Sequence, residues 1–128
     1  MAKDQDFTIG IEEEYLLVDP LSRDLVSEPP AGVLAECQST ITEDIGNVTP
    51  EFLRAQLEVA TPVCRSLAEC REKLILLRGL AARAAEQHGL RIIAASTHPF
   101  AAWAEQRHTD RERYNLLARD MQGVARRL

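Results

Sequence analysis

Residues 7–18 have the sequence FTIGIEEEYLLV, which carries the clearest structural pattern of the chain. The odd-numbered residues of this stretch include many β-branched and aromatic side chains, as expected for one face of an extended chain. They are Phe7, Ile9, Ile11, Tyr15 and Leu17. An Asp-Pro pair at residues 19–20 ends the pattern, because proline has no N–H to donate and restricts the residue before it. The stretch therefore predicts a β-strand.

The rest of the chain alternates between helical and extended patterns. A second strand is expected over residues 55–61, with Leu57 and Val59 on one side and Gln56 and Glu58 on the other, and a third over residues 90–95. Thr49 and a following proline resemble a helix N-terminus and predict one helical turn over residues 50–54. These elements together indicate an α+β fold.

Three helices are expected in addition. A short one covers residues 31–37. A long one begins at Ser66, which opens a capping box with the glutamate three residues later, and ends at Gly89. A second capping box at Thr109 opens a helix that continues to Leu128, after a loop over residues 96–108.

Composition indicates a single globular domain. The 128 residues are 45% hydrophobic and 27% charged, typical of soluble proteins, and the longest apolar run is far too short to cross a membrane. The N-terminus lacks an apolar signal core, so a cytoplasmic protein is expected. Three cysteines without a C-x-x-C motif favour reduced, buried thiols over a disulfide or zinc site.

The charges are unevenly distributed. Residues 1–62 contain 13 acidic and 3 basic residues, whereas residues 63–128 contain 7 acidic and 12 basic ones. The acidic half is suited to cations. The low isoelectric point of about 5.2 and the lack of a dense basic cluster with aromatic residues argue against a nucleic-acid-binding class.

The acidic triplet at residues 12–14 carries the sharpest chemical signal. Because side chains alternate along a strand, Glu12 and Glu14 project to one face and Glu13 to the other. Carboxylates held close together repel each other, so a cation between them is one interpretation, and oxygen ligands without His or Cys suit Mg²⁺ or Mn²⁺. The alternative is that these acids simply solvate an exposed strand face. Glu58 favours the metal interpretation, because three carboxylates converge if the two strands are neighbours.

Two uncharged residues extend this candidate site. Gly10 shares the face of the two glutamates and leaves room for a ligand, and Gln56 lies on the same side of its strand as Glu58. Both are therefore expected to contribute to cofactor binding. No arrangement of Ser, His, Asp or Cys points to a nucleophile, and no catalytic residue is assigned.

Four segments resemble the glutamate–cysteine ligase type 2 group of carboxylate–amine ligases. Residues 7–19 resemble the first strand of this family. The QLEVATP segment at residues 56–62, the STHPF segment at residues 96–100, and an Arg-Tyr pair at 113–114 followed by QGVARR at 122–127 match in the same order.

The resemblance implies a fold similar to the glutamine synthetase catalytic domain, an antiparallel sheet backed by helices. It implies an ATP-dependent ligase in which Mg²⁺–ATP activates the γ-carboxylate of glutamate as an acyl phosphate that an amine such as cysteine attacks. The metal ligands of the family correspond to Glu12, Glu14 and Glu58. Because family chains are much longer, residues 1–128 are expected to be the N-terminal part of one catalytic domain, incomplete at its C-terminus.

Two further residues are candidates for substrate binding: Thr61, which follows the second strand, and His98, in the loop before Pro99. The alternative for Thr61 is a purely structural role at the end of a strand. The alternative for His98 is a loop histidine whose hydrogen bonds are structural. The competing functional hypothesis is a non-catalytic module that binds a divalent ion or nucleotide, or a homo-oligomerisation module whose partner-facing residues are Leu74, Leu77, Met121 and Leu128.

Overall fold

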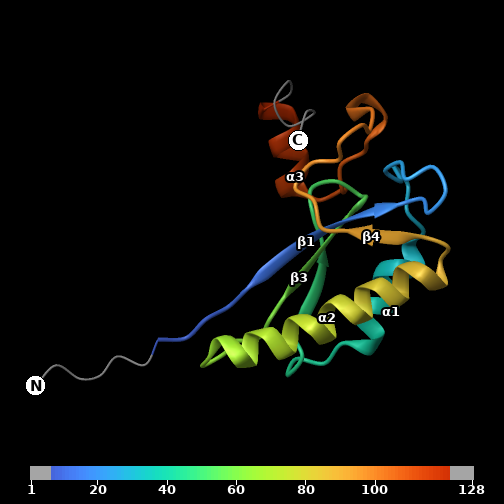
Figure 1. Ribbon diagram of the computed structural model, residues 1–128. Helices are drawn as coiled ribbons and strands as arrows, with labels where there is room; N and C mark the ends of the chain where they lie inside the picture. The colour runs from blue at the N-terminus through green and yellow to red at the C-terminus, as the bar shows by residue number, and fades with distance from the viewer. Residues whose placement is uncertain (1–6, 122–128) are drawn as a thin grey trace, which may run out of the picture.

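Strand β1 (Glu12–Val18) lies inside a four-stranded antiparallel sheet. The other strands are β2 (Asn47–Pro50), β3 (Gln56–Ala60) and β4 (Arg91–Ile93), and the strand order is β2-β3-β1-β4. This arrangement comes from a computed structural model that describes residues 7–121, shown in Figure 1. The α+β class and the antiparallel sheet expected from the sequence are confirmed.

Helices α1 (Ala31–Thr40) and α2 (Leu67–Gln87) cover one face of this sheet (Figure 1). Odd-numbered residues of the two central strands project into this layer and pack against α2. The resulting core comprises Tyr15, Leu17, Leu57, Val59, Leu77, Ala81, Ala84 and Ala85. No helix in the described part of the chain is both long and apolar enough to span a lipid bilayer.

Helix α2 begins and ends as its sequence predicts. The Ser66 side chain accepts a hydrogen bond of 3.1 Å from the Glu69 N–H, and the Glu69 carboxylate accepts one of 2.7 Å from the Arg65 N–H. At the other end Gly89 has a φ of 73°, the left-handed conformation that glycine adopts most readily. Local hydrogen bonding thus fixes both boundaries of the longest element.

Burial of Leu77 argues against the oligomerisation surface of the competing hypothesis. This leucine is fully buried in the core under α2, so the hypothesis that it faces a partner is wrong. Helical periodicity identifies an apolar stripe without specifying whether the sheet or another chain covers it. Met121 is exposed, and Leu128 lies outside the described residues.

The second face of the sheet is covered at only one end. Leu16 and Val18 pack there with Leu25 and Ala55. Ala95 and Ala101, from the segment that follows β4, lie against this cluster. The same segment includes a 3-10 turn (Trp103–Glu105) and leads into helix α3 (Glu112–Asp120), which lies beyond this end of the sheet in Figure 1. The other half of β1, which contains Glu12 and Glu14, leaves these two side chains exposed on this face.

Two sequence-based assignments need correction. Residues 50–54 do not form a helical turn, because Thr49 and Pro50 pair with β3 as the end of β2, an edge strand where proline is tolerated. Thr109 does not cap α3, which follows Arg111 without a side-chain cap. Its hydroxyl instead donates to the Glu51 carbonyl oxygen. In the first case pairing with the next strand replaces the expected helical turn, and in the second a contact 58 residues away replaces the expected cap.

The remaining differences concern lengths. The first strand begins at Glu12, not Phe7, although Ile9 forms an isolated bridge with Cys64. The third strand of the sequence prediction is shortened to residues 91–93, whereas α1 extends to Thr40. The expected continuation of the last helix over residues 122–128 lies outside the described range.

Candidate metal centre

Strand register places Glu14 directly opposite Glu58. These residues are Cα partners in the antiparallel β1–β3 pair, and Thr49 of β2 is the partner of Glu58 on its other side. Residues paired in this way project to the same face of a sheet. The convergence of two of the predicted carboxylates thus follows from backbone hydrogen bonding.

A third carboxylate completes the cluster, and sequence reasoning missed it. Glu51 follows β2 directly, and one carboxylate oxygen from each of Glu14, Glu51 and Glu58 lies within 4.8 Å of the others. Because the Thr-Pro pair predicted a helical turn here, Glu51 was not expected near the sheet. Its place at the sheet follows from the extended strand β2, which ends at Pro50 and which no local sequence signal indicated.

The other two glutamates of the triplet lie differently. Glu12 is exposed on the same face as Glu14 but pairs with Ala60, one pleat away from the cluster. Glu13 projects to the helical face, as alternation predicts, where Arg78 Nε donates to it at 2.8 Å and the Tyr15 hydroxyl also donates. These hydrogen bonds, chiefly that from Arg78, lower the pKa of Glu13.

The cluster carries negative charge that the protein does not neutralise by direct ion pairs. Within residues 7–121 no Lys or Arg forms a salt bridge with Glu14, Glu51 or Glu58. The pKa of Glu58 is raised, first by burial and then by the charge of Glu51, with smaller contributions from Glu12 and Glu14. Like charges held directly across a strand pair are destabilising. An oxygen-only donor set of this charge fits a hard divalent cation such as Mg²⁺ or Mn²⁺.

Two hydroxyl groups hold the carboxylates in place. Thr49 Oγ1 donates to Glu58 Oε1 at 3.2 Å, and the Tyr114 hydroxyl donates to Glu51 Oε2 at 3.3 Å. Among the described residues, the other oxygen of each carboxylate accepts no hydrogen bond. Glu51 and Glu58 are therefore each fixed through one oxygen and retain a second for a ligand.

The other predicted site residues near the acidic cluster have structural contacts. Gln56 is buried, and its Oε1 accepts from the Leu53 N–H at 2.9 Å, which closes the turn between β2 and β3. Thr61 Oγ1 accepts from the Ile11 N–H at 3.0 Å and so extends the pairing of β1 with β3. Gly10 is exposed just before β1, with open space where a Cβ would lie. Their roles in cofactor or substrate binding stay predictions.

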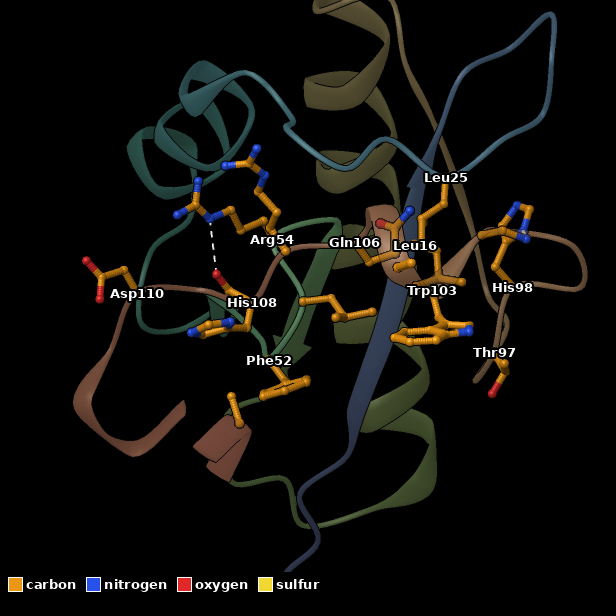
Figure 2. A pocket seen from close by; sticks show the side chains of 15 residues that line it. Leu16, Leu25, Phe52, Arg54, Thr97, His98, Trp103, Gln106, His108 and Asp110 are labelled. Carbon is orange, nitrogen blue, oxygen red and sulfur yellow. Dashed lines mark hydrogen bonds between the residues drawn. The ribbon is translucent and has the colours of Figure 1, made fainter. Parts of the chain in front are cut away.

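His98 lies in a cavity of about 690 Å³ on the same sheet face as the cluster. Leu16 and Phe52 also line this cavity, and Figure 2 shows His98 across it from Phe52. His98 Nε2 lies 2.9 Å from the Arg23 carbonyl oxygen, while Nδ1 accepts from the Ala101 N–H at 3.0 Å. The imidazole thus joins two loops, and its role in substrate binding stays a prediction.

The same cavity contains one buried polar atom without a partner. Gln106 Oε1 accepts no hydrogen bond within the described range, although the side chain lines the cavity (Figure 2). Phe52, which lines the cavity, follows Glu51 of the acidic cluster in sequence.

Comparison with known proteins gives a consistent family assignment. The profile of the family described as "Glutamate-cysteine ligase family 2" matches residues 8–128. A protein of Rhodospirillum rubrum named "Putative glutamate--cysteine ligase 2" is 56% identical over 123 residues, which cover 95% of this chain and 32% of that protein. Proteins of the same name from Jannaschia sp. and Paracoccus denitrificans are 50% and 43% identical, over 98% and 100% of this chain and 32% and 33% of theirs. The chain thus spans about a third of the length of these curated relatives. It belongs to the glutamate–cysteine ligase family 2.

Proposed function

We propose that this chain supplies the metal-binding part of an ATP-dependent carboxylate–amine ligase. The reaction joins the γ-carboxylate of glutamate, or a similar acid, to an amine such as that of cysteine, through an acyl phosphate formed with ATP. Family membership supports the ligase class. The observation that carries the proposal is the convergence of Glu14, Glu51 and Glu58 on an open sheet face.

The three carboxylates are the proposed ligands of Mg²⁺, with Mn²⁺ as an alternative. When bound, such an ion neutralises phosphate oxygens and so stabilises the charge that develops during phosphoryl transfer. ATP and glutamate are both anions and would be repelled by the bare cluster. Two of the ligands lie on hydrogen-bonded strands, so the backbone ladder holds their separation nearly constant.

A chimera tests this function. Residues 1–128 replace the matching third of the Rhodospirillum rubrum relative, and hydroxylamine is added with glutamate and ATP to trap an acyl phosphate as glutamyl hydroxamate. We expect Mg²⁺-dependent hydroxamate from the chimera, and loss of at least a hundredfold when Glu58→Gln is introduced. The matched control is Glu13→Gln, which changes a glutamate on the opposite face.

Retention of full hydroxamate formation in the Glu58→Gln chimera would exclude the acidic cluster from the reaction. Metal binding without any hydroxamate, in a chimera whose parent relative is active, would favour a non-catalytic ion-binding module.

A further inference from the structure

Helix α3 contacts the acidic cluster through one side chain. The ring of Tyr114 is buried between α3 and the segment after β2, where it meets Phe52 edge to face at a centroid distance of 5.9 Å. From this fixed position its hydroxyl reaches Glu51 Oε2. A residue 63 positions away in sequence thus determines where this carboxylate lies.

The backbone around Glu51 is held by the same part of the chain. The Thr109 hydroxyl donates to the Glu51 carbonyl oxygen, and the Thr109 N–H donates to the Phe52 carbonyl oxygen at 2.8 Å. Leu53 and His108 form an isolated antiparallel bridge beside these contacts. Glu51 lies outside the strands, so these contacts replace the ladder that fixes Glu14 and Glu58.

We infer that Tyr114 is a positioning residue for the metal centre, because its hydroxyl bonds one oxygen of the Glu51 carboxylate and so fixes the orientation of a carboxylate that would hold the ion. This inference rests on the proposed metal site. Partners of this kind orient metal ligands and commonly change metal affinity by 10- to 100-fold when they are lost. Because the Tyr114 hydroxyl contact is single and 3.3 Å long, the lower end of that range applies.

Titration with Mn²⁺ alone, followed by electron paramagnetic resonance of the free ion, tests this role on the intact chain. Tyr114→Phe removes the hydroxyl and keeps the ring, so we expect Mn²⁺ to bind about tenfold more weakly while the circular dichroism spectrum is unchanged. Tyr15→Phe is the matched control, since its hydroxyl donates to Glu13 on the opposite sheet face. Its Mn²⁺ affinity should equal that of the wild type.

The outcomes separate the two claims. Equal Mn²⁺ affinity in wild type and Tyr114→Phe, together with loss of binding in Glu51→Gln, would overturn the positioning role and leave the metal site intact. Failure of the wild type to bind Mn²⁺ at millimolar concentration would overturn the metal site itself.

A second measurement applies if Tyr114→Phe does not fold. Mn²⁺ should then slow backbone hydrogen exchange over residues 112–120 of the wild type, because an ion that orders Glu51 also favours the docked position of α3. Unchanged exchange in this helix at saturating Mn²⁺ would contradict the inference.

Discussion

At the residue scale, Glu58 shows that a residue of a binding site can destabilise the folded protein. Its side chain is partly buried beside two other carboxylates, and its pKa is raised by that burial and by their charge. Without a cation, ionised Glu58 therefore destabilises the folded state. The same repulsion is what gives a divalent ion its attraction to this position.

The substitution Glu58→Gln should stabilise the metal-free chain by about 0.5 kcal/mol at pH 7, since it removes a like charge directly across the strand pair. A carboxyl whose folded-state pKa is raised contributes stability below its ordinary value of 4.5 and loses it as the pH rises through the raised value. The advantage of Glu58→Gln over the wild type should therefore shrink as the pH falls.

Urea unfolding with a chelator present, at pH 7 and pH 5, measures this difference. Glu36→Gln, which changes an exposed glutamate on α1, is the control and should match the wild type at pH 7. A Glu58→Gln variant less stable than the wild type at pH 7 would contradict the expected repulsion.

At the scale of elements, α2 separates residues that build the core from those that do not. Leu77 is fully buried against the sheet, whereas its neighbour Leu76 is 49% exposed. Leu77→Ala should lower the free energy of unfolding by about 3 kcal/mol, and Leu76→Ala by less than about 1 kcal/mol. Urea denaturation of both variants at one pH tests this contrast. Similar losses in the two would mean that the outer surface of α2 is also buried, as in an oligomer.

Elements with strong local signals could be predicted from the sequence. Alternating side chains identified β1 and β3, and the Ser66 capping box and Gly89 located the ends of α2. Strand β2 was missed because a proline at its end favoured a helical turn locally, while its pairing with β3 stabilises the extended chain.

Prediction of the site was limited in the same way. Alternation could place Glu14 and Glu58 each on one side of its own strand, and the β1–β3 register then brings them to one face. Glu51 could not, since its position depends on β2 and on contacts from Thr109 and Tyr114 more than 50 residues away. Segments distant in sequence thus meet at Glu51, where the local sequence pattern does not predict the structure.

At the scale of the whole molecule, the two sheet faces serve different purposes. One is closed by α1 and α2 over an apolar core, and the ion pair of Glu13 with Arg78 lies on that side. The other is covered only at the end near α3 and leaves the acidic cluster exposed in part. The cluster joins residues of β1 and β3 with the residue that follows β2. An ion bound there would therefore stabilise the folded chain as a whole.

Mn²⁺ should therefore raise the thermal unfolding midpoint of the chain. A free ion concentration one hundred times the dissociation constant stabilises the folded state by about 2.7 kcal/mol. For a domain of this size that corresponds to a rise of roughly 10 °C. Glu58→Gln and Glu51→Gln should abolish the rise, whereas Glu13→Gln should retain it because that side chain faces α2. Circular dichroism melts with and without Mn²⁺ measure the shift, and an equal rise in all four proteins would place the bound ion away from the cluster.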